Sequence, residues 1–346
     1  IISFFTFIFF LGVLNKYKDF GTDIPGAIVS FYILLIIIYS IFDKKIKINK
    51  KILVIILPLV FFAFVIKITN SLIFIYLFFI LGRITGLRIG RKLFSNLFLI
   101  IGPLMKSKKI IKKNLQIFSK QGSNINEKKI INLMWKNYGM TFIEYIFLDL
   151  FRKKNSHIIV EGEENLLQII KNKEPVIFVS GHFANFELMS MEITKRNIPL
   201  ATIYRPLNNF FLNPLMEYLR KKYVCKNQIK KGLKGVRETI NFIKQKNCVA
   251  LMIDQRVSEG EKVNFFGVPA LTTTLPAQLS SKFNLDIIPV FIKRDPKNKF
   301  KIEFQKRIRS RDFKDKLELT KELNKSLEKM IIKNPSQWIW THNRWK

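Results

Sequence analysis

The chain has 346 residues, of which 59 are Lys or Arg and 25 are Asp or Glu, so its formal net charge is +34. Hydrophobic residues still make up 48% of it, which favours a protein held at an anionic membrane over a nucleic-acid binder; no helix-turn-helix, zinc-finger or ribonucleoprotein motif is present. The two cysteines, Cys225 and Cys248, are too few for a disulfide framework and suit a reducing compartment.

Apolar runs dominate residues 1–90, which we expect to form a membrane region of several apolar helices. A membrane-spanning helix needs roughly 20 apolar residues. The second run comes nearest to this length, and the shorter ones can tilt or form a hairpin. The four runs lie at 1–14, 27–42, 52–66 and 71–81.

The loop at 43–51 (DKKIKINKK) predicts the orientation of this region. It holds five Lys and one Asp, and such loops stay on the cytoplasmic side. If the last two runs cross out and back, residues 91–346 form a cytoplasmic-face domain. Lys pairs at 108–109 and 112–113 can then bind anionic lipid headgroups.

Beyond residue 90, strand-like and helix-like segments alternate, which predicts an α/β domain with a central mixed, mainly buried sheet flanked by helices. We expect strands at 157–162, 176–179, 200–204, 248–253, 287–292 and 300–304. Helices are expected at 126–150, 184–193, 211–222, 232–246, from 274 onward and at 316–332, with a loop at 264–269.

A histidine follows the second of these strands directly. Ser180 and Gly181 break the strand, His182 comes next, and Glu187 lies in the following helix. A His with a carboxylate partner can take a proton from a hydroxyl, although such pairs are often purely structural. Five helical steps separate two residues by about 140°, so His182 reaches Glu187 only from the turn before the helix. With three histidines, no HExxH and no GxSxG, the sequence predicts neither a metal site nor a serine nucleophile.

Several blocks together resemble one family. GHFANFE, at 181–187, is similar to the H-x4-D/E block of the lysophospholipid acyltransferase superfamily. Within it, the chain resembles the lipid A late acyltransferases, the lauroyl- and myristoyl-transfer enzymes of Gram-negative bacteria. The other blocks are YRPLNN (204–209), KKGLKGVRETINFIKQKNCVALMIDQR (230–256), NFFGVPALTTT (264–274) and NPSQWIWTHNRWK (334–346). The family usually has one N-terminal membrane helix, so residues 1–70 are extra to its pattern.

The resemblance implies a membrane-bound O-acyltransferase on the cytoplasmic face of the bacterial inner membrane. The donor would be an acyl carrier protein, and the acceptor a hydroxyl of a phosphorylated glycolipid, the lipid A precursor. No cofactor is implied. The basic domain fits both an acidic carrier and a phosphorylated acceptor. Anionic membrane lipid is a further expected partner, and nucleic acid is not.

The expected mechanism assigns His182 as general base and Glu187 as the carboxylate that orients it. Asp254, at the end of a predicted strand, is either a second partner for His182 or the cap of the following loop. Arg205 is a candidate oxyanion donor or a phosphate-binding or structural residue. The expected substrate-binding residues are Arg205, Asn208, Arg220 and Arg256, although scattered surface arginine is the commoner explanation for the last two. The tail tryptophans are expected to pack or to lie at the membrane interface.

Two basic clusters are candidate docking sites for the carrier, one at 301–316 and one formed by Lys230, Lys231 and Lys234. The rival functions are a superfamily acyltransferase that uses acyl-CoA or a glycerol- or mannoside-based acceptor, and a non-enzymatic membrane scaffold. Intact His182 and Glu187 disfavour the scaffold.

Overall fold

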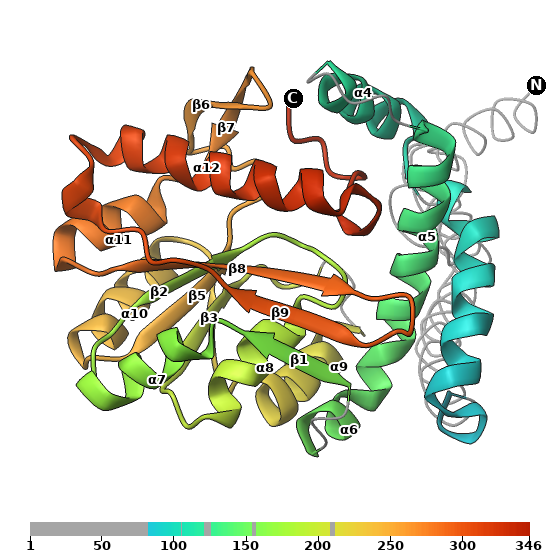
Figure 1. The fold of residues 1–346 in the computed structure, drawn as a ribbon, viewed down its shortest axis with the longest axis horizontal. Coiled ribbons are helices and arrows are strands. Elements are labelled where there is room, and N and C mark those ends of the chain that lie inside the picture. The colour runs from blue at the N-terminus through green and yellow to red at the C-terminus, as the bar shows by residue number, and fades with distance from the viewer. Residues whose placement is uncertain (1–81, 105, 121–125, 154–156, 208–211) are drawn as a thin grey trace, which may run out of the picture. The chain divides into compact units, whose positions relative to one another are not determined.

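A computed structural model of the chain describes residues 82–104, 106–120, 126–153, 157–207 and 212–346 (Figure 1). The chain divides into two compact units, Ile1–Ile84 and Thr85–Lys346, and the sheet belongs to the second. The four N-terminal apolar runs lie outside the described residues. Within the described part, no helix is both long and apolar enough to cross a membrane.

A seven-stranded sheet forms the centre, in the order β1-β9-β8-β2-β5-β3-β4. The strands from β8 to β4 in this order are parallel, whereas β9 is antiparallel to β8 and parallel to β1. The expected mixed sheet is therefore confirmed. The strands are β1 (Ile158–Glu161), β2 (Ile177–Ser180), β3 (Leu200–Tyr204), β4 (Asn227–Lys230), β5 (Cys248–Met252), β8 (Ile287–Arg294) and β9 (Phe300–Phe304).

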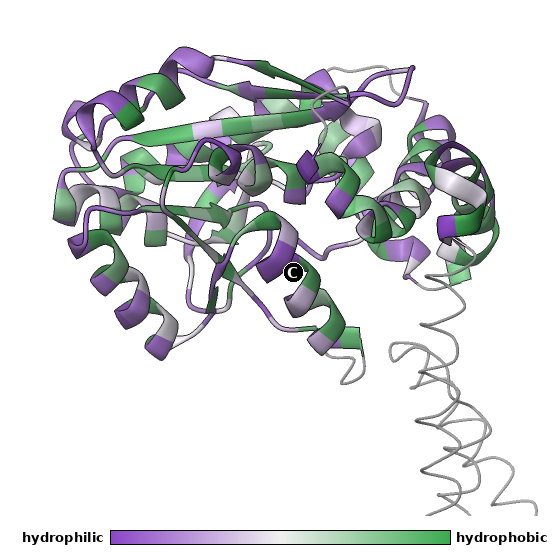
Figure 2. Ribbon diagram, turned by 90° about the horizontal axis from the view of Figure 1, so that it is seen from below, coloured by the Kyte–Doolittle hydropathy of each residue, from purple (hydrophilic) through white to green (hydrophobic). Residues whose placement is uncertain are grey.

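Helices cover both faces of this sheet. Figure 1 shows α11 (Leu275–Phe283) and α12 (Lys316–Lys333) on one side, with α7 (Glu163–Asn172), α8 (Glu187–Lys195) and α9 (Leu212–Leu219) on the other. Every residue of β2 is buried because helices cover both faces of the sheet, and this burial explains the apolar run Ile177–Val179. In the hydropathy colouring of Figure 2, the strands at the centre of the sheet are largely green.

Three further helices lie beside the sheet: the helix at 82–104, α4 (Lys108–Ser119) and α5 (Glu127–Glu144) (Figure 1). The helix at 82–104 packs on α5 backbone to backbone, since a Cβ on Gly139 would lie 2.1 Å from the Phe94 carbonyl oxygen.

The outer face of the helix at 82–104 is apolar and exposed. From Ile89 onward, its exposed large hydrophobic side chains recur at three- and four-residue steps, and they are between 42% and 73% exposed. Residues 82–120 contain no Asp or Glu, and α4 adds exposed lysines at its start. The exposed apolar residues, here called the outer stripe, are Ile89, Leu93, Leu97, Ile100 and Leu104.

The C-terminal tail is part of the core. Trp338, Trp340 and Trp345 are buried, which confirms the packing role expected for them. Asn114 of α4 donates from Nδ2 to the carbonyls of Trp340 (2.8 Å) and His342 (2.7 Å). The tail is thereby tied to α4.

Two of the β-structures differ from expectation. The loop expected at 264–269 is the tip of a hairpin, β6 (Glu261–Phe265) with β7 (Val268–Thr272), on a separate two-stranded sheet. Its turn residues Phe266 and Gly267 both have positive φ, and Phe-Gly is not one of the sequence pairs that signal such a turn. The edge strand β4 is a second addition. It reads NQIK, a sequence too polar to predict a strand.

Candidate active site

The site begins where β2 ends. Gly181 follows Ser180, and a Cβ on it would lie 2.8 Å from the Phe183 ring and 2.9 Å from Leu327. A side chain at this position would have to displace both of these buried side chains, so glycine fits it best. His182 comes next, at the carboxyl edge of parallel strands, where open α/β sheets bind ligands.

The carboxylate that orients His182 belongs to Asp254, which follows β5, the neighbour of β2. His182 Nδ1 lies 2.7 Å from Asp254 Oδ1. The backbone N–H of His182 (2.8 Å) and Trp338 Nε1 (2.9 Å) both donate to Asp254 Oδ2. The structure thus decides between the two alternatives left open for Asp254, in favour of the partner.

The pKa of His182 is raised and that of Asp254 is lowered. Burial lowers the pKa of His182, but the charge and hydrogen bond of Asp254 outweigh it, so the pKa lies above its ordinary value. Burial raises the pKa of Asp254, but the charge of His182, its ring and backbone hydrogen bonds and the hydrogen bond from Trp338 hold this pKa below its usual range. The His182 side chain remains 20% exposed, whereas that of Asp254 is fully buried. The histidine can therefore meet a substrate with an ionised partner behind it.

The pairing expected between His182 and Glu187 is wrong. Glu187 is the first residue of α8, and Oε1 accepts from the Tyr145 hydroxyl (2.7 Å) and from Arg220 Nε (2.8 Å). Residues 184–186, expected to be the first helical turn, form a bend and a turn instead, which changes the direction of the Glu187 side chain. Glu187 still contributes through its charge, which raises the pKa of His182.

The four expected substrate-binding residues have different environments. Arg220 is held by Glu187, with Nη2 2.6 Å from Oε1, at the start of a π-helical turn after α9. Arg205 is exposed just beyond β3, at the same sheet edge as His182. The backbone N–H of Arg256 donates to His342 Nε2 (2.9 Å). Asn208 lies outside the described residues.

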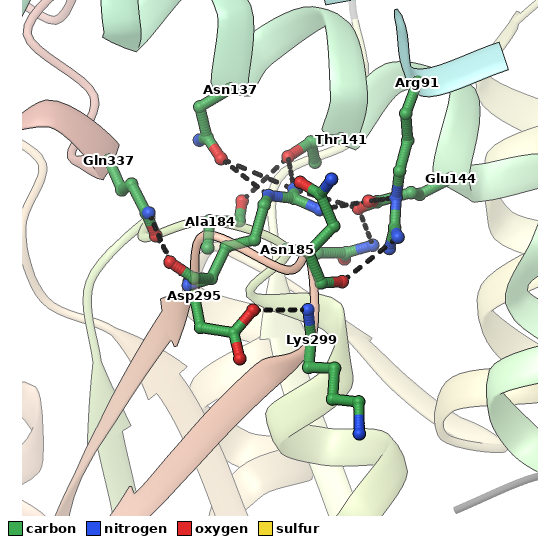
Figure 3. A network of polar contacts seen from close by, with 11 residues as sticks. Arg91, Asn137, Thr141, Glu144, Ala184, Asn185, Asp295, Lys299 and Gln337 are labelled. Atoms are coloured by element: carbon green, nitrogen blue, oxygen red, sulfur yellow. Dashed lines mark hydrogen bonds and ion pairs between the residues drawn. The ribbon is translucent and has the colours of Figure 1, made fainter. Parts of the chain in front are cut away.

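A buried ionic network lies behind the loop that carries His182 (Figure 3). Glu144, at the end of α5, is fully buried between Arg91 and Arg294. Arg91 Nε donates to Glu144 Oε1 (2.6 Å), and Arg294 donates to both carboxylate oxygens. Asn185 Nδ2 donates to Glu144 Oε2 (3.0 Å). Burial raises the pKa of Glu144, but the two arginines hold it below its ordinary value, so the carboxylate is ionised.

Sequence reasoning missed Glu144, Trp338 and His342. The available signal for Glu144 was an acid within an apolar helical stretch (FIEYIF), and such an acid needs a buried partner. Across the part of the chain that the structure describes, no three His, Cys, Asp or Glu side chains cluster as metal ligands.

Comparison with known proteins identifies the family. The model of the bacterial lipid A biosynthesis acyltransferase family matches residues 63–346. A lipid A biosynthesis palmitoleoyltransferase of Escherichia coli is 25% identical over 260 residues, covering 70% of this chain and 80% of that protein. A lipid A biosynthesis lauroyltransferase of the same organism is 24% identical, covering 69% and 78%.

A lipid A biosynthesis acyltransferase of Haemophilus influenzae is also 24% identical, covering 68% of this chain and 76% of that protein. With a match over most of its length, the chain belongs to the bacterial lipid A biosynthesis acyltransferases and is an O-acyltransferase of the lipid A type.

Proposed function

We propose that the protein transfers a fatty acyl chain from the thioester of an acyl carrier protein to a hydroxyl of a phosphorylated lipid A precursor. The observation that carries this proposal is the His182–Asp254 pair, with a partly exposed imidazole before a buried, ionised carboxylate. Such a pair suits removal of a proton from a hydroxyl near neutral pH.

In the proposed reaction, His182 Nε2 takes the proton of the acceptor hydroxyl as its oxygen bonds to the thioester carbonyl carbon. The C–S bond of the tetrahedral intermediate then breaks, and the carrier thiolate leaves. The imidazolium returns its proton to that sulfur. Asp254 stabilises the positive charge between the two transfers, and Trp338 holds Asp254 in place. Base catalysis of this kind contributes ~10²–10⁴-fold.

Arg220 is the proposed contact for the negative charge of the acceptor or of the tetrahedral oxyanion. Its guanidinium is held by Glu187 and stands over the Tyr204 ring, with Cζ 6.0 Å from the ring centroid. Glu187 therefore serves the reaction by fixing Arg220. Arg205 and Arg256 are proposed to add further phosphate contacts from the same edge of the sheet.

The proposal includes a place at the cytoplasmic face of the inner membrane. The outer stripe and the exposed lysines of α4 support it, because apolar residues bordered by Lys fit an interface of acyl chains and anionic headgroups. The expected membrane region at 1–90 and acyltransferase domain at 91–346 remain part of the proposal.

The experiment is product analysis with the purified full chain. Lipid A precursor is offered with acyl carrier proteins of several chain lengths or with acyl-CoA, and products are read by mass spectrometry. We expect one added acyl chain, from the carrier only, and none with His182→Ala. His157→Ala is the matched control, because His157 lies before the edge strand β1. Normal turnover by His182→Ala would refute the mechanism, and transfer from acyl-CoA alone would favour the rival donor.

A further inference from the structure

The loop between His182 and Glu187 has an unfavourable backbone conformation. Ala184 has a φ of 44°, in the left-handed region that residues with a Cβ rarely adopt. Such a conformation persists only where the surroundings over-determine it. Something outside the loop must therefore hold it, and three contacts do so.

Two of these contacts come from α5 and one from the tail. Thr141 Oγ1 donates to the Ala184 carbonyl (3.0 Å). The Ala184 N–H donates to the Gln337 carbonyl (3.1 Å). The third is the bond from Asn185 Nδ2 to Glu144 Oε2 (3.0 Å), in which both side chains are fully buried. The ring of Phe186, the next residue, packs edge-on against His182, with centroids 4.6 Å apart.

The hydrogen bond from Asn185 to Glu144 is a strong one, because its acceptor is an ionised carboxylate. A carboxylate accepts a stronger hydrogen bond than a neutral acceptor, and a fully buried one needs cationic partners to remain ionised. Arg91 and Arg294 supply them. Arg294 is itself fixed by Asn137 Oδ1, which lies 3.4 Å from its Nε and Nη2 (Figure 3). The network therefore joins the helix at 82–104, α5 and β8 to the catalytic loop.

We infer that Glu144 and Asn185 are positioning residues for acyl transfer. Acting through Asn185, the ionised carboxylate of Glu144 holds the turn at 183–186, and so fixes His182 relative to Glu187 and Arg220. Neither residue touches the reacting atoms. The inference rests on the proposed function of His182, because a position matters only if that histidine does the chemistry.

The chain offers a matched pair of variants. Asn185→Ala removes the bond between loop and network but leaves both arginine–carboxylate pairs intact. Asn137→Ala removes a buried amide from the same network without touching the loop. We expect similar losses of thermal stability from the two. Asn185→Ala should also lower kcat about 10- to 100-fold, since small misplacements of catalytic groups have effects of this size.

Three readouts separate positioning from a structural role. The KM for each substrate should stay within about twofold of wild type, and the acid limb of the pH–rate profile should not move, because His182 and Asp254 are untouched. In the double variant with Glu144→Gln, the two losses in kcat should not add, because the residues act as one unit. If Glu144→Gln fails to fold, Thr141→Val replaces it, since it removes the other α5 contact to the loop.

Equal kcat for Asn185→Ala and Asn137→Ala would overturn the inference, and so would full additivity in the double variant. The proposed function fails separately: if His182→Ala turns over normally, the mechanism is wrong whatever the loop variants do. If His182→Ala is inactive while Asn185→Ala matches Asn137→Ala, only the positioning role is wrong.

Discussion

Burial and the charge of Asp254 act on the pKa of His182 in opposite directions, and in the proposed mechanism their balance sets the pH dependence of the enzyme. Burial alone would lower its pKa, yet Asp254 raises it above the ordinary value of about 6.5. A general base works in its neutral form. Activity should therefore be present above the raised pKa and be lost as the pH falls through it.

The first prediction is an acid limb of kcat/KM with an apparent pKa above about 6.5. Asp254→Asn should move this limb to lower pH, because burial then acts without the opposing charge, while the plateau falls. The effect on stability has the opposite pH dependence to the effect on activity. Protonated His182 stabilises the fold below about pH 6.5, and this stabilisation is lost as the pH rises through the pKa of His182 in the folded protein. A limb that stays in place in Asp254→Asn would show that another group titrates.

The second prediction ranks the two carboxylates. Asp254→Asn should lower kcat by ~10²–10⁴-fold, since it leaves the imidazolium without its counter-charge. Glu187→Gln should lower kcat less and raise the KM for the phosphorylated acceptor, because it loosens Arg220. Steady-state kinetics with both substrates varied measures this. A larger loss of kcat in Glu187→Gln would return the orienting role to Glu187.

The sequence placed His182 in the turn after a strand, and this prediction holds because it needed only local signals. Whether Glu187 can reach His182 depends on the backbone conformation of residues 183–186, and the sequence did not predict that conformation. Ala184 in the left-handed region sets that conformation. Glu144 and Trp338 lie 41 and 84 positions from the groups they bind, Asn185 and Asp254. No local pattern reports contacts of that separation.

At the scale of elements, the central strands were predictable because a strand buried on two faces is a continuous apolar run. The long helices were predictable from hydrophobic residues at three- and four-residue steps. The hairpin β6–β7 and the edge strand β4 were not, since their residues are polar or lie at an unusual turn. The spacing of hydrophobic residues along the chain also does not predict where two helix backbones come close together. The packing of the helix at 82–104 on α5 is such a case, because Gly139 and Gly102 both lie too close to the facing helix to carry a Cβ.

The third prediction tests that packing. In Gly139→Ala, the new methyl would meet the backbone oxygen of Phe94, so the helices must separate and unfolding should become easier by about 1–3 kcal/mol. Gly90→Ala is the control on the facing helix, because its Cβ would meet side-chain atoms and no backbone: Ile143 Cγ1 at 3.1 Å and Thr85 Oγ1 at 3.7 Å. Denaturant unfolding of both measures the difference. Equal stability would mean that the backbones do not approach as closely as described.

For the molecule as a whole, sheet topology separates the two basic clusters. Ile308 bridges to Ile287 at the start of β8, so the cluster at 306–311 lies at the amino end of the sheet. His182 follows the carboxyl end of β2, about 16 Å away at ~3.3 Å per residue along that strand. Arg307 is also engaged by Glu174 and Asp286. This cluster is poorly placed to bring a donor to the site.

The cluster at Lys230, Lys231 and Lys234 lies at the carboxyl edge. Lys230 pairs in register with Tyr204, at the same end of the sheet as His182. The three strand spacings between β4 and β2 amount to roughly 14 Å. Leu233, between the lysines, is 86% exposed. A basic surface with an exposed apolar side chain suits the acidic carrier that is proposed as the donor.

The fourth prediction follows from this geometry. Lys231→Glu with Lys234→Glu should raise the KM for the acyl carrier several-fold and leave kcat at saturation nearly unchanged, because charges at the rim of an interface act mainly on association. Lys306→Glu with Arg309→Glu makes the same change in net charge at the opposite edge and serves as the control. Added salt should raise the wild-type KM, since the Debye length falls from ~8 Å at physiological ionic strength to about 3 Å at 1 M. The KM for the carrier is measured in detergent, where lipid headgroups are absent. Equal increases of this KM in the two double variants would mean that net charge alone attracts the carrier and that no docking site exists at the carboxyl edge.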